Sequence, residues 1–128
     1  MLNVYSLKKD GNLRLSLNFR VKEFACKDGS DPIFIDSDLV SILQKIRTHF
    51  KKPVTITSAY RTPTHNKSCG GTTYSQHLYG KAADIKVQGI APKEVATYAE
   101  TLLGEGGIGI YNTFTHIDVR STKSRWQG

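Results

Sequence analysis

The sequence predicts an α+β fold, with one domain over residues 1–128 that combines a mainly antiparallel sheet with flanking helices. A length of 128 residues is enough for one hydrophobic core but not for two independent domains. Some segments repeat apolar residues at helical spacing, whereas others are β-branched or alternate between apolar and polar residues. The strand-like segments near the end of the chain follow one another directly, which favours antiparallel pairing.

The first element that the pattern predicts is a helix over residues 36–50. Asp36 or Ser37 can cap this helix, and apolar side chains recur along it every three or four residues. Pro53 separates the helix from a β-branched run at residues 54–57, which is typical of a strand.

Residues 61–80 are rich in Thr, Gly, Ser and Asn and are predicted to be a long irregular loop. A loop of this length inside a compact domain is usually functional or disordered. The loop leads into a predicted strand over residues 82–87. A second helix is predicted from Pro92 to Leu103, with Gly104 as its stop.

A hairpin is predicted for residues 108–111 and 115–119, which flank a short turn. In its second strand the side chains of His116, Asp118 and Arg120 share one face, opposite the apolar face.

Polar groups from two strands are therefore expected on one face of the sheet. Asp84 takes the polar face of its own strand, together with His116 and Asp118, and His77 lies just ahead of that strand. Two imidazoles and a carboxylate suit Zn²⁺ with an open position for water. An isolated strand histidine is more often a structural polar residue, and the HExxH signature is absent. The spacing alone leaves both interpretations open.

Composition and charge limit the classes of partner. With 18 Lys+Arg and 11 Asp+Glu the net charge is +7, which suits an anionic partner such as nucleic acid or a bacterial wall polymer. The basic residues are scattered, so we expect no nucleic-acid partner. No apolar run approaches the roughly 20 residues that span a bilayer, and the start of the chain lacks the pattern of a secretory signal. We therefore expect no membrane partner and no secretory signal on this chain.

The two cysteines, Cys26 and Cys69, are too far apart in the sequence to form a CxxC pair. We expect them to be free thiols, with a single disulfide bridge as the alternative.

Three ordered motifs carry a resemblance to a known family. Residues 75–84 read S-x-H-x-x-G-x-A-x-D, residues 58–63 read S-A-Y-R-T-P, and G-I-G-I-Y at 107–111 is followed by H-I-D-V at 116–119. Together they resemble the zinc D-alanyl-D-alanine carboxypeptidase family of peptidoglycan peptidases, whose fold is shared by the hedgehog signalling proteins. The resemblance extends over roughly residues 19–126.

This resemblance implies one zinc ion per chain, with His77, Asp84 and His116 as its ligands. It also implies that Arg61 is catalytic, polarising the substrate carbonyl or binding the substrate carboxylate, and that Ser75 contacts the substrate.

The chain departs from the family pattern just before the last histidine. Many members carry an acidic or basic catalytic residue two or three positions earlier, where this chain has Phe114 and Thr113, neither of which can move a proton. We expect Asp118 to act as the general base, because it shares a strand face with His116. The alternatives are that Asp118 accepts a hydrogen bond from the ligand imidazole and orients it, or that it is an unrelated surface carboxylate.

The leading hypothesis is a monomeric zinc peptidase that hydrolyses an amide bond next to a D-amino acid in peptidoglycan peptides, as a carboxypeptidase or an endopeptidase. Such a chain could be a phage or prophage lysis enzyme, or a domain of a longer secreted protein. The main alternative is a catalytically weak or inactive zinc-fold module that binds cell-wall polymer. A small basic nucleic-acid binder is a third option, which only the net charge supports.

Overall fold

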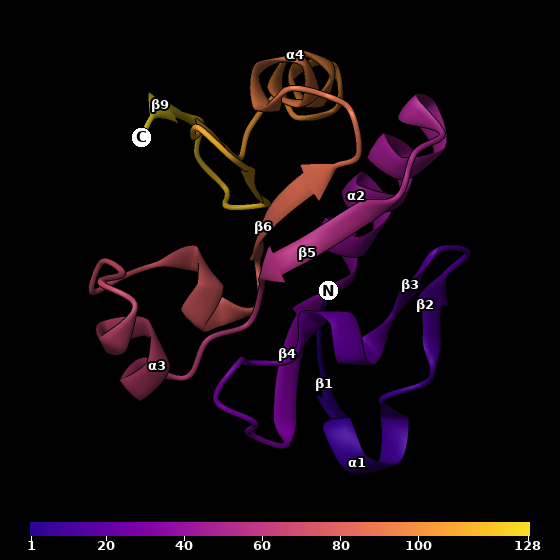
Figure 1. Cartoon of the computed structure of the whole chain (residues 1–128). Helices are drawn as coiled ribbons and strands as arrows, with labels where there is room; N and C mark the ends of the chain where they lie inside the picture. Colours follow the sequence, from indigo (N-terminus) through magenta and orange to yellow (C-terminus); the bar gives the residue numbers. More distant parts are fainter.

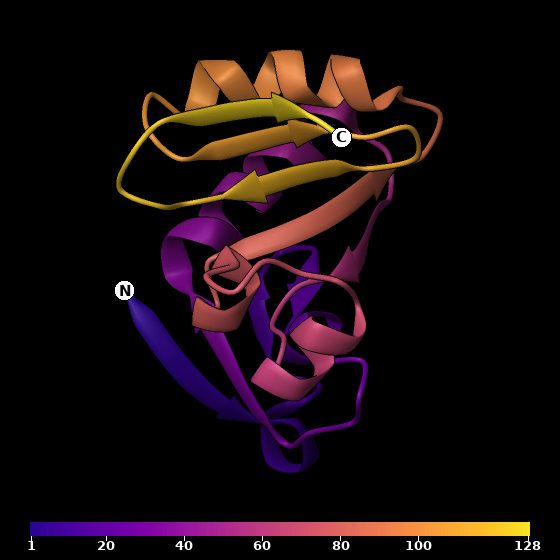
Figure 2. The same cartoon turned by 90° about the vertical axis from the view of Figure 1, so that its left-hand side faces the viewer.

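A five-stranded sheet carries the two polar strands that the sequence predicts. In the computed structural model, which describes residues 1–128, its strands lie in the order β5 (Val54–Ser58), β6 (Ala82–Val87), β8 (Thr115–Asp118), β7 (Gly107–Ile110) and β9 (Ser124–Gln127). Neighbouring strands are antiparallel, except that β9 is parallel to β7. Figure 2 shows β9, β7, β8 and β6 side by side. The predicted strands and the hairpin are confirmed, with ends within one residue of those expected.

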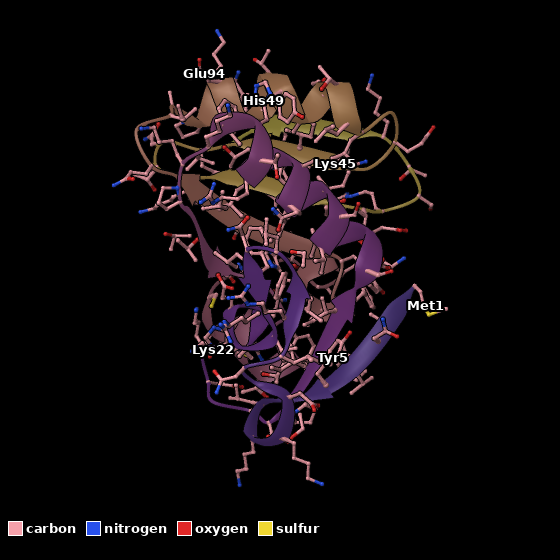
Figure 3. The ribbon with its side chains drawn as sticks, turned by 90° about the vertical axis from the view of Figure 1, so that its right-hand side faces the viewer. Met1, Tyr5, Lys22, Lys45, His49 and Glu94 are labelled. Carbon is pink, nitrogen blue, oxygen red and sulfur yellow. The ribbon has the colours of Figure 1, made fainter.

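Two helices, α2 (Ser37–Phe50) and α4 (Pro92–Leu102), pack against the same face of the sheet. Figure 3 shows this side of the molecule, with α2 in front of the sheet. No helix of the chain has the length and apolar character needed to cross a bilayer. The helices and sheet together confirm the α+β class and a single compact domain.

Both long helices begin as the sequence predicts. The side chain of Asp36 caps α2 by accepting a hydrogen bond from the backbone N–H of Asp38 at 2.9 Å. Pro92 occupies the first turn of α4, where its missing N–H costs nothing. This helix ends at Leu102, one residue before the predicted end.

The prediction of an irregular loop over residues 61–80 was wrong, because two short helices lie within it. They are α3 (Pro63–Ser68) and the 3₁₀ helix η2 (Gln76–Tyr79). Each is capped by a side chain, Thr62 for α3 and Ser75 for η2. Helices of six and four residues are too short to show an apolar period, so only the cap residues could have indicated them. In Figure 2 α3 lies on the opposite side of the sheet from α2.

The N-terminal third forms a small lobe that the sequence analysis did not predict. Its elements are β1 (Leu2–Ser6), α1 (Leu7–Asp10), β2 (Arg14–Ser16), β3 (Phe19–Arg20), the 3₁₀ helix η1 (Val21–Phe24) and β4 (Pro32–Asp36). β1 pairs with β4, and β2 pairs with β3, in two separate two-stranded sheets (Figure 1). Elements of two to five residues offer too few positions for a period to be recognised.

The core is one cluster that lies between α2, α4 and the sheet and extends to the N-terminal elements. Ile85 of β6 and Ile117 of β8 are buried there together with Leu43 of α2. Because side chains alternate along a strand, burying these two isoleucines turns the polar residues beside them toward the other face of the sheet. The face of the sheet opposite the two isoleucines is therefore the predicted polar face.

Candidate metal centre

Two neighbouring strands and one short helix bring the three predicted metal ligands together. Asp84 of β6 is the direct register partner of His116 on β8, and His77 projects from η2. All three residues are buried, and one nitrogen or oxygen atom from each lies within 4.8 Å of the others. The carboxylate of Asp84 approaches both rings, with Oδ2 at 3.3 Å from His77 Nε2 and Oδ1 at 3.0 Å from His116 Nδ1.

Neighbouring acceptors determine which nitrogen of each imidazole carries a proton. Nδ1 of His77 lies 2.7 Å from the carbonyl oxygen of Ala59, so it must donate to that oxygen. Nε2 of His116 lies 2.7 Å from the carboxylate of Asp118, so it donates there. The other nitrogen of each ring, Nε2 of His77 and Nδ1 of His116, faces the carboxylate of Asp84.

When these two nitrogens carry lone pairs, they repel the carboxylate, and a cation between the three groups offsets that repulsion. Protons can take this place: burial lowers the pKa of His116, but hydrogen bonds with Asp118 and Asp84 outweigh burial and raise it overall. Burial likewise raises the pKa of Asp84, whereas its contacts with His116 and His77 hold it well below its usual range. A metal ion can take the same place, and two imidazoles with a carboxylate are a ligand set that suits zinc. The residues present fit a zinc ion.

Arg61 lies against this group and is held in a fixed orientation. Its Nη2 donates to Asp84 Oδ2 at 3.3 Å, its Nε to Ser58 Oγ at 2.9 Å and its Nη1 to Asn66 Oδ1 at 3.2 Å. Asn66 is itself buried and donates to the carbonyl oxygen of Thr72 at 2.8 Å. Ser58 and Asn66 were not predicted as partners of Arg61, although both lie within five positions of it.

A cleft of about 580 Å³ opens over the site. Its lining includes the three candidate ligands, Arg61 and Ser75, together with Tyr111, Phe114, Arg120 and Trp126. Tyr111 and Phe114 stack with ring centroids 4.4 Å apart. The cleft thus combines a cationic and metal-binding floor with an aromatic wall.

The family model of Peptidase M15 matches residues 16–118, which is most of the chain and includes all three candidate ligands. The chain belongs to the Peptidase M15 family. No curated protein matches it. Peptidases of this family depend on zinc, and the His-Asp-His group of this member could bind one metal ion. The resemblance seen in the sequence is confirmed.

Ser75, the predicted substrate contact of this M15 peptidase, lies at the start of η2. Its Oγ accepts a hydrogen bond from the backbone N–H of His77 at 3.3 Å, and the residue lines the cleft. Its observed role is to cap the helix that carries His77, and its contact with substrate stays a prediction.

Asp118 is completely buried and does not line the cleft. Its carboxylate accepts a hydrogen bond from His116 Nε2 at 2.7 Å and is also held by Arg120. Burial raises the pKa of Asp118, but the hydrogen bonds from Arg120 and His116 outweigh burial and lower it. These contacts show that Asp118 is not an unrelated surface carboxylate. They favour a role in which Asp118 orients His116 over one in which it transfers a proton in the cleft.

The two cysteines of the M15 chain are free thiols, as expected, with Cys26 buried and Cys69 exposed.

Gly80 ends η2 with a positive φ of 70° and so sets the turn between His77 and Asp84. A Cβ there would overlap the backbone carbonyl of Phe34. We expect Gly80→Ala to lower the free energy of unfolding by about 2–4 kcal/mol, because it adds a clash to an unfavourable φ. Gly89→Ala is the matched control, since its φ is 74° but no atom lies within 4 Å of its Cβ. Thermal unfolding of the two variants measures this, and equal losses would show that the Phe34 contact is irrelevant.

Proposed function

We propose that this protein is a zinc peptidase that hydrolyses an amide bond next to a D-amino acid in peptidoglycan peptides. The observation that carries the proposal is the convergence of His77, Asp84 and His116 in the cleft, with one nitrogen of each ring facing the carboxylate. Membership of the Peptidase M15 family supports a zinc peptidase that acts on peptidoglycan-type substrates. In this proposal the protein acts as a monomer at the bacterial cell wall, which its net charge of +7 suits.

A zinc ion bound at the three ligands supplies Lewis acidity toward a carbonyl oxygen and lowers the pKa of water. Arg61 contributes directed hydrogen bonds. Three of its five N–H donors are used by Ser58, Asn66 and Asp84, which leaves two donors in a rigid fork. Such a fork suits the oxyanion that develops on the reacting carbonyl, or the carboxylate of the substrate.

The aromatic wall orients the substrate and excludes water from the cleft. Trp126 Nε1 donates to the hydroxyl of Tyr111 at 2.9 Å, and Tyr111 stacks on Phe114, so the three rings form a continuous surface. A half-buried aromatic face that lines a cleft can pack against apolar parts of a peptide. In the proposal the Ser75 hydroxyl contacts the substrate opposite this wall.

The test is incubation of the zinc-loaded protein with purified peptidoglycan, followed by mass spectrometry of the soluble products. A carboxypeptidase is expected to release a free terminal D-amino acid, whereas an endopeptidase is expected to release peptides or divide cross-linked ones. The His116→Ala protein, which lacks a ligand, is the control and is expected to release nothing. Unchanged peptidoglycan in the presence of fully zinc-loaded wild-type protein would contradict the proposal.

A second candidate function is a zinc-containing module that binds cell-wall polymer without cleaving it. The observation that favours it is the lack of a proton-transfer group at Thr113 and Phe114, together with the burial of Asp118 away from the cleft. Co-sedimentation separates the two functions. A binding module is expected to sediment with intact peptidoglycan in a zinc-dependent manner and to leave its peptides unchanged in the mass spectrum.

A further inference from the structure

The end of the chain, beyond the segment matched by the family model, supplies three residues to the cleft, Arg120, Ser124 and Trp126. We propose that one of them, Arg120, is a positioning residue that fixes the ring of His116 through Asp118, and that Trp126 holds this arrangement in place. The inference rests on the proposed role of His116 as a metal ligand. It deepens that role by naming the groups that orient the ligand.

Arg120 holds the Asp118 carboxylate through two side-chain hydrogen bonds and one backbone hydrogen bond. Its Nε donates to Asp118 Oδ1 at 2.8 Å, its Nη2 donates to Oδ2 at 2.6 Å, and its backbone N–H donates to Oδ1 at 3.1 Å. Paired N–H donors on one carboxylate fix its plane as well as its position. Because the Asp118 side chain is completely buried, no water competes for these contacts.

The same carboxylate oxygen that Arg120 holds also accepts a hydrogen bond from the ligand ring. Asp118 Oδ2 accepts from Arg120 Nη2 and, at 2.7 Å, from His116 Nε2. A carboxylate fixed in this way keeps the proton on Nε2 and the lone pair of Nδ1 directed at Asp84. A lysine at position 120 could reach one oxygen but could not define the plane of the carboxylate.

Trp126 covers these contacts from the cleft side. Its ring lies 5.0 Å from the His116 ring, and the Arg120 guanidinium carbon lies 5.4 Å from its centroid, within cation–π range. Gly109 makes this possible: it is the register partner of both His116 and Trp126, and a Cβ there would come within 2.5 Å of the indole. The hydrogen bond to Tyr111 then fixes the orientation of the indole.

Zinc affinity measured at one fixed pH, by competition with a chromogenic chelator, tests the proposal. We expect Arg120→Gln to bind zinc about 10- to 100-fold more weakly than wild type, and Arg120→Lys to recover part of the loss. Lys123→Gln is the matched control, because it removes the same charge from the same connection between β8 and β9 at an exposed position. Its zinc affinity is expected to equal that of wild type.

A ring-specific readout separates positioning from a purely structural role. Long-range ¹H–¹⁵N spectra of the histidine rings are expected to show His116 protonated only at Nε2 in the zinc-loaded wild type. In Arg120→Gln the two nitrogens should lose this distinction, or the Nε2 proton should exchange faster with solvent. Trp126→Ala is expected to speed this exchange more than Trp126→Phe does.

If Arg120→Gln shows a lower Tm but unchanged zinc affinity and unchanged His116 ring signals, Arg120 is only structural and the proposal is overturned. Neither measurement requires turnover. A wild-type protein that binds zinc and does not cleave peptidoglycan would refute the peptidase proposal and leave this inference standing. A wild-type protein that binds no zinc would overturn this inference together with the ligand assignment on which it rests.

Discussion

Replacing His116 with alanine is expected to remove most of the zinc from the purified protein and to abolish hydrolysis of peptidoglycan. The change deletes the Nδ1 atom that faces Asp84 and leaves the buried Asp118 without its imidazole partner. Two remaining ligands do not make a stable tetrahedral zinc site. His77→Ala is expected to have the same effect, since it removes the third donor of the group.

Metal analysis of the purified variants checks this result. His49→Ala is the matched control, because His49 is an exposed histidine on α2 that stacks on Tyr98 on the helix-covered side of the molecule (Figure 3). It should retain zinc as the wild type does. Full retention of zinc in both His77→Ala and His116→Ala would refute the ligand assignment.

Arg61→Lys is expected to lower kcat/KM by about 10²-fold while the zinc content stays near that of wild type. Lysine keeps the positive charge beside Asp84. It cannot reproduce the bonds to Ser58 and Asn66 that hold the guanidinium in place, nor the two free donors that face the cleft. The loss should therefore appear in turnover and not in metal binding.

Steady-state kinetics on a defined peptidoglycan peptide measures the Arg61 effect. Lys67→Gln removes an exposed cation from α3, six positions away in the sequence, and should leave the kinetics unchanged. Wild-type kinetics in Arg61→Lys would show that Arg61 is a surface cation with no part in the reaction.

The polar face of the metal centre could be predicted from the sequence because Asp84 and His116 follow regular strands, whereas His77 lies on η2 and the ligand set itself came from the family resemblance. Alternation placed Asp84 and His116 on one sheet face, and the structure pairs them directly across β6 and β8. The same alternation grouped Arg120 with His116 and Asp118, which is the contact chain that the structure contains. A period of two carries this information because it needs only a few residues of strand.

The partners that fix the ligands could not be predicted, because they come from irregular backbone. The carbonyl oxygen of Ala59 sets the proton on His77 across 18 positions of sequence, and no pattern of side chains reports a backbone acceptor. Trp126 reaches His116 only because β9 adds to the sheet in parallel beside Gly109. A strand of four residues is too short to show a period from which its pairing with β7 could be predicted.

The expectation that Asp118 is the general base depended on its spacing from His116. That spacing does place both side chains on one face of the strand, but it does not show whether the carboxylate is open to the cleft. Spacing on a strand fixes which face a side chain takes but not how deeply it is covered. This carboxylate is buried beside Gly107 of β7, and it accepts hydrogen bonds from His116 and Arg120 and does not line the cleft. Burial of this kind comes from tertiary packing, which sequence alternation does not contain.

The most direct test of the central claim is a zinc titration of metal-free protein, with release of peptides or D-amino acids from peptidoglycan measured by mass spectrometry at each step. If the His77, Asp84 and His116 group holds the metal that the reaction needs, product release should rise from zero and level off at one zinc per chain. Product release that is the same without zinc, or that stays at zero once each chain carries one zinc ion, would contradict the account.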